Sequence, residues 1–342
     1  MTTTKSATVQ YRSRFRLIGL VLLVGLLSAC GGDSSNGPIL IKFPHVTAPG
    51  TPKGLAADRF KMLVEERMPG IVTVEVYPSG QLMNDDDSID ALAFGEVQMI
   101  AVSLSKLDRL TKKYQVFDLP FLFVDLAAAE RFQSGPAREE LLGAVLKSGI
   151  RGVGFWHNGM KQFGGPVPIT SPEAAEGLKF RIMESDVLQA QILQMGGNPQ
   201  KMAFGEVYQA LQTGAVDAQE NTWANTYSSK FYEVQPYLTE SNHGYLGYLL
   251  AVNEPFWQSL PEDVRQQLQV IIDEVSAWGN DQAKEVNAGA LANIIQSGRS
   301  EIARLNDDER KVWADTMLTV WDTFSDSIGE NLLNAALAAG QQ

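Results

Sequence analysis

The sequence predicts an α/β fold divided into two domains. Between residues 39 and 102, short β-rich runs alternate with amphipathic stretches bounded by Gly, Pro and Asn, a pattern typical of helices packed on a sheet. The chain has 342 residues, of which 44% are hydrophobic, so it can build more core than one domain usually contains. The sequence contains no internal repeat. We therefore expect two α/β lobes that are discontinuous in sequence.

The first thirty residues have the features of an export signal and are excluded from the fold. A basic segment without acidic residues precedes the apolar run 17–27, which is too short to span a bilayer. The run ends in LSAC, which resembles a bacterial lipobox whose cysteine, Cys30, becomes the lipidated first residue. Ordinary cleavage beside an unmodified cysteine is the alternative. We expect a signal peptide over residues 1–29 and a lipidated tether over 30–37.

Charge and cysteine content restrict the function. Cys30 is the only cysteine in the sequence, so the exported protein has no internal disulfide. The formal charge is −12, and removing the four basic residues of the leader leaves 24 Lys and Arg against 40 Asp and Glu, a charge of −16. This acidity opposes nucleic-acid binding. An anionic ligand would have to be captured by a few local cations in apolar surroundings.

The first half of the chain alternates strands and helices. Asn84 or Asp85 is suited to cap a helix that Gly95 ends. We expect strands over 39–43, 71–77, 98–102 and 152–156, and helices over 53–67, about 84–94 and 126–147, the last broken at Gly135-Pro136.

The second half contains shorter elements followed by long helices. Ser259 and Glu262 have capping-box spacing, and no proline interrupts the tract between Pro261 and Gly298. We expect strands over 178–183 and from 241, and helices starting at Ser171, over 186–195 and 206–212, over the long tract, and after the cap at Asn306.

Arg181 lies within the apolar segment 178–183. A guanidinium in a buried strand is costly unless it meets an anion. One interpretation is a structural salt bridge to Glu184, Asp217 or Glu220. The other is a site for an anionic ligand.

The block from Gly177 to Asn221 resembles the signature region of the solute-binding subunits of TRAP transporters, the DctP-type periplasmic receptors for organic acids. The family patterns GLKxR and AFSEVYxALQTGxVDGQEN are matched by residues 177–181 and 203–221. Further family patterns lie at 77–82, 92–99, 118–123, 156–162, 227–235 and 242–248. The resemblance extends from about residue 39 to at least 262.

The resemblance implies a periplasmic-binding-protein-like fold, with two lobes around a central cleft and a long helix spanning both. On this basis we expect lobe I to comprise residues 38–158 and 247–286. Lobe II would then comprise residues 159–246 and 287–338.

The resemblance also implies roles for individual residues. In such proteins the arginine of the motif, here Arg181, binds the substrate carboxylate, and the final asparagine, Asn221, helps to hold it. Some members have an arginine where Lys161 stands, and it acts as a second cation toward the ligand; a surface lysine is the alternative. A second cation would suit a second carboxylate, so a C4-dicarboxylate is the favoured ligand. Phe204 would supply an aromatic wall.

Loops beyond the carboxyl ends of strands supply further candidates. His45 would either donate to a carboxylate or bind backbone. Ser103 and Ser105 belong to a pocket-forming loop, whereas we expect Lys106 to be a solvated lysine at a helix start. His243 and Tyr248 are secondary candidates, for which packing roles are favoured.

Three residues complicate the match. Ala218 and Gly205 replace a glycine and a serine of the family pattern, and both changes could reshape the cleft. Glu184 would repel a carboxylate if it faced inward. We expect Glu184 to point outward or to pair with Lys161, in which case the second cation would be lost.

Nothing in the sequence indicates catalysis. Residues 152–154 read GVG, but a histidine replaces the third glycine of a dinucleotide fingerprint. The three histidines, His45, His157 and His243, are widely separated and lack metal-ligand spacing, and there is no P-loop. No catalytic residue, cofactor or metal is expected.

Together these features predict a monomeric, extracytoplasmic solute-binding protein, anchored in the periplasm through lipid on Cys30. It would capture a small organic acid and deliver it to the membrane permease subunits of a TRAP transporter. The alternative is an extracytoplasmic ligand sensor that signals to a membrane partner.

Overall fold

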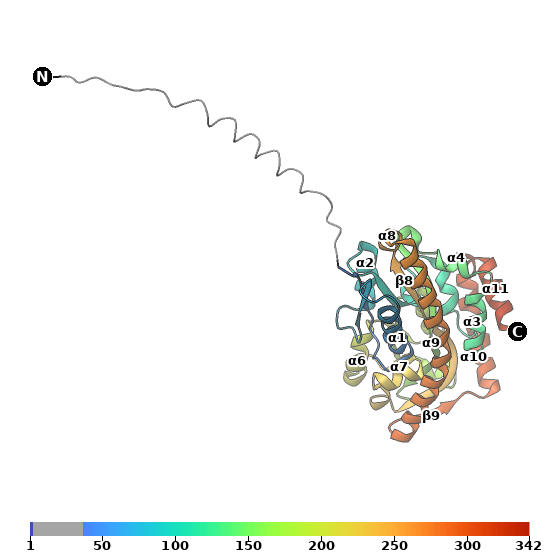
Figure 1. Ribbon diagram of the computed structural model, residues 1–342. Helices are drawn as coiled ribbons and strands as arrows, with labels where there is room; N and C mark the ends of the chain where they lie inside the picture. The colour runs from blue at the N-terminus through green and yellow to red at the C-terminus, as the bar shows by residue number, and fades with distance from the viewer. Residues whose placement is uncertain (3–36, 342) are drawn as a thin grey trace. The chain divides into compact units, whose positions relative to one another are not determined.

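A computed structural model describes Met1, Thr2 and residues 37–341 of the chain (Figure 1). The chain divides into the units Met1–Pro38 and Ile39–Gln342, and the fold below is that of the second unit. The predicted signal peptide, Cys30 and almost all of the predicted tether lie outside the described residues. Within the described part, no helix is both long enough and apolar enough to cross a membrane.

The fold is mixed α/β, as predicted. Its strands are β1 (Ile39–Pro44), β2 (Val72–Tyr77), β3 (Met99–Ser103), β4 (Ile150–Gly165), β5 (Lys179–Ile182), β6 (Asn198–Lys201), β7 (Ala218–Asn221), β8 (Tyr237–Asn253) and β9 (Glu301–Arg304). Its α-helices are α1 (Pro52–Arg67), α2 (Asp85–Phe94), α3 (Leu126–Ser134), α4 (Arg138–Leu142), α5 (Asp186–Gln194), α6 (Val207–Thr213), α7 (Trp223–Ser228), α8 (Glu254–Ser259), α9 (Glu262–Ser297), α10 (Asp307–Ile328) and α11 (Glu330–Gly340). The 3-10 helices η1 (Leu104–Leu107) and η2 (Lys112–Asp118) follow β3.

Two long antiparallel strands, β4 and β8, form the centre of the main sheet. Its order is β3-β8-β4-β7-β5-β6, and β9 also pairs with β8. At one end of β8, Ser103 of β3 is opposite Tyr248; at the other end, β9 pairs with residues 237–240. β1 and β2 form a separate parallel pair. β8 therefore pairs with β3 near one of its ends and with β9 near the other, and β4 runs beside it.

Alternate residues of β8 face two hydrophobic cores. Leu249 and Ala251 belong to a core shared with α3, α10 and α11. Leu250 and Val252 belong to a core shared with α1 and α9. This two-residue period is that of a strand buried on both faces. Figure 1 accordingly shows α3, α10 and α11 gathered together, away from α1.

Helix α9 is fastened to β4 by polar contacts. The Trp156 indole donates to Ser276 Oγ over 2.9 Å, and the His157 backbone N–H donates to Asn280 Oδ1 over 2.8 Å. Farther along the helix, Asn287 Nδ2 donates to the Asn158 carbonyl over 2.6 Å. The long helix is thereby held to the strand at the level where the lobes were predicted to meet.

The predicted lobe boundaries fall at matching positions on β4 and β8. His157 is the register partner of Gly247, and Gly159 is the partner of Leu246, with a register shift between them at Asn158. The division of the chain at 158/159 and 246/247 remains a prediction.

Several predicted elements are confirmed and others are wrong in extent. The break at Gly135-Pro136 separates α3 from α4, and the tract after Pro261 is the single helix α9. The strand expected over 152–156 is only a part of β4. The predicted capping box is absent, because Ser259 ends α8 and its hydroxyl donates to the Phe256 carbonyl.

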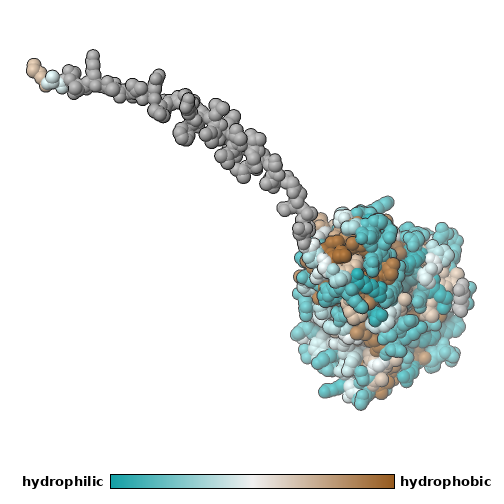
Figure 2. All heavy atoms as spheres, in the orientation of Figure 1, coloured by the Kyte–Doolittle hydropathy of each residue, from teal (hydrophilic) through white to brown (hydrophobic). Residues whose placement is uncertain are grey.

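On the surface visible in Figure 2, hydrophobic side chains form small clusters. Figure 2 shows a face covered mostly by hydrophilic side chains, with hydrophobic ones in smaller groups. This matches the strongly acidic composition of the chain.

Candidate functional site

A hollow of about 400 Å³, a volume that includes the solvent at its open mouth, is lined by residues of β3, β4, β5, β7, β8 and α1. The residues that line it come from both predicted lobes and include Thr47, Lys53, Ser103, Lys161, Arg181 and Asn221. It therefore brings together several residues that are far apart in the sequence.

Arg181 enters this hollow from β5. Its neighbours Phe180 and Ile182 are fully buried in the hydrophobic core, so the alternation of the strand directs Arg181 the other way. Its Nε and Nη2 atoms donate to the Met202 carbonyl over 3.1 and 2.8 Å. The side chain is 2% exposed, and burial lowers its pKa to about 10.

None of the salt bridges considered for Arg181 forms. Over the described residues, no carboxylate lies within 4.0 Å of its guanidinium. Glu184 is exposed, Asp217 binds Lys179, and Glu220 binds Lys161. Arg181 is thus a buried cation with N–H groups left to donate, which is the arrangement that an anionic ligand would complete.

Asn221 lies at the end of β7 with its amide oriented by its neighbours. Its Oδ1 accepts from the Thr222 backbone N–H over 3.1 Å and from Asn225 Nδ2 over 2.9 Å. The oxygen is therefore occupied within the protein. The amide NH₂ remains to donate toward the hollow, where a carboxylate could accept it.

Lys161 lines the hollow but is already paired. Its Nζ lies 2.7 Å from Glu220 Oε1, and both side chains are almost fully buried. The other oxygen, Oε2, lies 2.8 Å from His243 Nε2, and the His243 ring stacks on Phe163. Although burial opposes its ionisation, Lys161 and His243 lower the pKa of Glu220 to about 2. Lys161 is therefore not a surface lysine, and Glu220, rather than Glu184, compensates its charge.

The other predicted residues differ in whether they line the hollow. Phe204 and Ser103 line the hollow, and Ser103 Oγ is buried without a hydrogen-bond partner among the described residues. His45 does not line it, although Val46 and Thr47 do; its Nδ1 lies 3.4 Å from Thr47 Oγ1. The ring of His45 packs edge-on against Phe43 instead.

The family follows from comparison with known proteins. The family described as "Bacterial extracellular solute-binding protein, family 7", DctP, matches residues 43–327. The chain belongs to the DctP family. The predicted resemblance to TRAP solute-binding subunits is thereby confirmed.

Individual DctP relatives match over almost their whole length. The "C4-dicarboxylate-binding periplasmic protein DctP" of Shewanella loihica is 47% identical, over 95% of this chain and 97% of its own. The protein of the same name from Vibrio cholerae is 46% identical, over 95% of this chain and 98% of its own.

Solved structures of this family share the fold. A TRAP periplasmic solute binding protein from Shewanella oneidensis with bound succinate has a TM-score of 0.87 and 49% identity, covering 89% of this chain and 99% of that one. Another from Pseudomonas aeruginosa with bound L-malate has a TM-score of 0.82 and 43% identity, covering 84% and 100%. The predicted two-lobed α/β fold is confirmed.

Three further residues line the hollow of this DctP protein. Lys53 was not predicted there, and Lys106 and Tyr248 were expected in other roles. Lys106 is not solvated, because it is 3% exposed and its Nζ lies 2.6 Å from Asp86 Oδ2. Tyr248 lines the hollow rather than only packing. Lys53, in the first turn of α1, is fully buried. A lysine at a helix N-terminus opposes the helix dipole, and that conflict was the available signal for Lys53.

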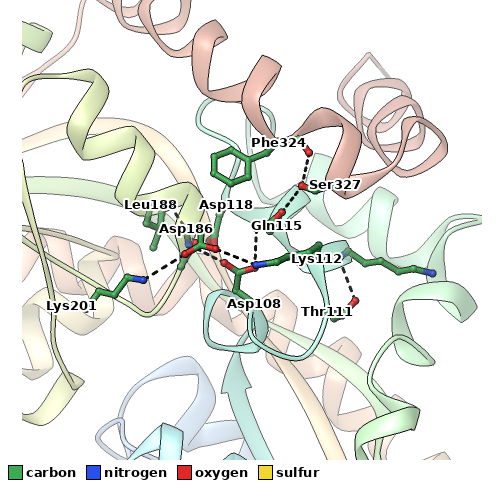
Figure 3. Close-up of polar contacts among 12 residues, drawn as sticks. Asp108, Thr111, Lys112, Gln115, Asp118, Asp186, Leu188, Lys201, Phe324 and Ser327 are labelled. Atoms are coloured by element: carbon green, nitrogen blue, oxygen red, sulfur yellow. Dashed lines mark hydrogen bonds and ion pairs between the residues drawn. The ribbon is translucent and has the colours of Figure 1, made fainter.

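A second polar network joins η2 to the start of α5 beside the hollow. Asp118 accepts from Ser105 and Ser185 hydroxyls over 2.6 and 2.7 Å, so Ser105 is used internally. Burial raises the pKa of Asp118 to about 6. Figure 3 shows Lys112 reaching both Asp108 and Asp186. Its Nζ lies 2.9 Å from Asp108 Oδ1 and 3.1 Å from Asp186 Oδ2.

This network satisfies its own groups. The Asp186 backbone N–H also donates to Asp108 Oδ2 over 2.9 Å, and Lys201 lies 3.6 Å from Asp186 Oδ1. Both lysines of this network have carboxylate partners, and Asp118 accepts from two hydroxyls, whereas no carboxylate of the described chain lies within 4.0 Å of the Arg181 guanidinium. The network fixes the N-terminus of α5 beside η2 and offers no comparable site for an anion.

In the part of the chain that the structure covers, no three His, Cys, Asp or Glu side chains are grouped to hold a metal ion. Burial lowers the pKa of both His45 and His157 to about 3, so both imidazoles are neutral near pH 7. What the geometry supports is recognition of an anion.

Proposed function

We propose that this DctP-family protein captures a C4-dicarboxylate such as succinate or malate in the periplasm and delivers it to a TRAP-type permease. The observation that carries the ligand class is Arg181, a buried guanidinium in the hollow without a carboxylate partner within the described chain. The names of relatives and the succinate and L-malate bound in similar structures support the same class.

In this proposal Arg181 and Asn221 hold one carboxylate of the ligand. The remaining N–H groups of the guanidinium donate to it, and the Asn221 amide adds a further donor. Each hydrogen bond to a charged group contributes roughly 1.5–3 kcal/mol. Phe204 covers the site with an aromatic surface that excludes water.

Ligand-driven closure follows from the two-lobed architecture. The lining residues of the hollow come from both predicted lobes, 38–158 with 247–286 and 159–246 with 287–338. A ligand that bridges them adds contacts present only in the closed state, which shifts the population toward that state. Binding and release then suffice for function, with no catalytic step.

A thermal-shift panel tests the ligand class. Succinate, malate, a keto acid and a sugar acid would be compared with butyrate, each at increasing concentration. A dicarboxylate at ~100 times its dissociation constant should raise the free energy of unfolding by about 2.7 kcal/mol. A panel that leaves the melting temperature unchanged would refute the proposed ligand class.

The proposal includes anchoring through lipid on Cys30, which lies outside the described residues. Its support is the LSAC sequence that ends the leader. Replacing Cys30→Ser should release the protein from the membrane fraction, and unchanged fractionation would count against the anchor. The sensor alternative would use the same hollow; the names of the relatives favour transport.

A further inference from the structure

Three large apolar side chains are exposed together where the folded unit begins. Phe94, the last residue of α2, is 83% exposed, more than any other large apolar side chain in residues 39–341. Ile71, directly before β2, is 49% exposed, and Leu40 of β1 is 38% exposed. Single exposed apolar residues are ordinary, whereas a group of them is typical of a docking surface.

The two residues at the strands point to the same side of the β1-β2 pair. Ile41 belongs to the core shared with α1 and α9, so its neighbour Leu40 points the opposite way. Val72 belongs to the same core, so Ile71 also points away from it. The Ile71 carbonyl accepts from the Ile39 backbone N–H over 2.8 Å, which places Ile71 beside the start of β1.

Phe94 stands on that side as well. Helix α2 packs into the core shared with α3, α10 and α11, which lies on the side of the sheet to which Leu40 points. Gln98 joins the end of α2 to β1: its Oε1 accepts from the Lys42 backbone N–H over 3.1 Å, and its Nε2 donates to the Gly95 carbonyl over 3.2 Å. Leu40, Ile71 and Phe94 therefore form one face, called the apolar face below.

The charges on the borders of the apolar face cancel. They are two lysines that have no carboxylate within 4.0 Å in the described chain, two acidic residues and one ion pair: Lys42 and Lys147, Glu75 and Glu96, and Asp90 with Arg109. The exported chain as a whole is predicted to carry a charge of −16. A strongly acidic protein approaches the anionic surface of a membrane with least repulsion through a face that is neutral.

The predicted anchor would bring this face to a membrane. The nine residues from Cys30 to Pro38 span at most about 32 Å when fully extended. A compact unit of about 300 residues has a radius of gyration of about 19 Å and is thus about 50 Å across. Lipid on Cys30 would therefore keep the start of β1 nearer to the bilayer than the far side of the unit. A short tether also gives a high effective concentration, so a weak contact suffices.

We propose that the apolar face docks on the phospholipid surface that carries the anchor, with its side chains entering the headgroup region. The proposal rests on the lipid anchor of the proposed function and goes beyond it, because it sets the orientation of the folded unit on the membrane. Leu40, Ile71 and Phe94 all belong to the predicted lobe I. Docking would hold that lobe at the membrane and leave the other lobe free to move when the hollow closes.

A fluorescent label on the apolar face tests the docking. Cys30 is the only cysteine in the sequence, so one added cysteine can be labelled alone once Cys30 carries lipid. Thr73→Cys places an environment-sensitive dye opposite Leu40 and keeps all three apolar side chains. Thr319→Cys is the matched control on α10, which Figure 1 shows well separated from α2. The full lipidated chain is placed in phosphatidylcholine vesicles that contain no other protein. The dye at 73 should shift to the blue and be quenched by quencher-labelled lipid, and the dye at 319 should do neither.

Substitutions within the apolar face show whether the native side chains hold it to the lipid. Leu40→Ser combined with Phe94→Ser should remove most of the quenching of the dye at 73, because the apolar area that enters the headgroup region is lost. The variant should stay in the membrane fraction through Cys30 and keep its thermal response to succinate. Val312→Ser combined with Leu318→Ser is the matched control, since both residues are exposed on α10, and it should keep the quenching.

The outcomes separate the docking from the anchor. If the dye at 73 is as accessible to water as the dye at 319, or if the Leu40 and Phe94 double variant keeps the quenching, the docking is overturned while the anchor stands. A blue shift that occurs only after permease is added to the vesicles would assign the apolar face to the permease and overturn the lipid contact. Wild-type protein that is absent from the membrane fraction would overturn the anchor and the docking together.

Discussion

Replacing Arg181 by lysine should weaken ligand binding while leaving the fold intact. The guanidinium performs two tasks at once, because Nε and Nη2 donate to the Met202 carbonyl while the remaining N–H groups face the hollow. An ammonium is a single point of donation and cannot keep the planar fork. We expect Arg181→Lys to lose at least one charge-assisted hydrogen bond to the ligand.

The magnitude follows from that lost bond. At roughly 1.5–3 kcal/mol per hydrogen bond to a charged group, succinate affinity should fall by about 10- to 100-fold. Arg181→Met removes the charge as well and should lose more. Both variants should fold, because the burial of β5 is supplied by Phe180 and Ile182.

Titration calorimetry with succinate measures the change, and urea unfolding without ligand checks the fold. Arg151→Lys is the matched control, since Arg151 makes a two-point contact with Glu254 that takes no part in the hollow. That variant should bind succinate as the wild type does. Near-native succinate affinity in Arg181→Lys would refute the view that the arginine fork binds the ligand.

Two further predictions concern buried charge and pH. Glu220→Gln leaves Lys161 as a buried cation without its carboxylate, so the free energy of unfolding should fall by about 3–5 kcal/mol in urea titrations; unchanged stability would contradict the pairing. His157 has a folded-state pKa of about 3, lowered by burial, against about 6.5 unfolded, so protons bind the unfolded chain preferentially and stability falls as pH decreases below 6.5. His157→Asn should make the loss between pH 7.5 and pH 5 smaller by about 2 kcal/mol. Parallel stability curves for the variant and the wild type would disprove that contribution.

Arg181 could be predicted from the sequence because the residues that identify it are its immediate neighbours in the chain. A charged residue flanked by Phe180 and Ile182 in a short strand is conspicuous, and the strand period separates it from the core. The matched motif then linked it to Asn221 on the neighbouring β7. Both residues line the hollow.

Lys53 and the partner of Lys161 could not be obtained in this way. The only local signal for Lys53 is that a lysine in the first turn of a helix opposes the dipole, and its burial arises where α1 packs near β3 and under α9. The pairing of Lys161 with Glu220 depends on the register of β4 against β7, in which Phe163 is opposite Glu220. Contacts between segments distant in the chain decide both.

Parts of the fold also could not be predicted from local sequence, because they depend on pairing with distant segments. β6 has the sequence NPQK, which lacks β-branched residues, and it is a strand only because it pairs with β5. β4 extends well beyond the predicted run because β8 pairs with it from Ile150 to Gly165, with three register shifts. Pairing, rather than intrinsic propensity, determines these elements.

The continuity of β4 and β8 has a mechanical consequence. Two paired strands, with α9 fastened alongside, carry the backbone from one end of the sheet to the other. Any opening of the hollow must therefore bend a hydrogen-bonded ribbon, which stores elastic strain, whereas a flexible linker would gain entropy on opening. The restoring force would act without ligand, and its softest points would be the three register shifts of β4 against β8, at residues 153, 158 and 162, where the pairing is already interrupted. The balance between the open and closed states would then depend on how strongly the main chains of β4 and β8 pair. Mutations far from any ligand contact could shift that balance.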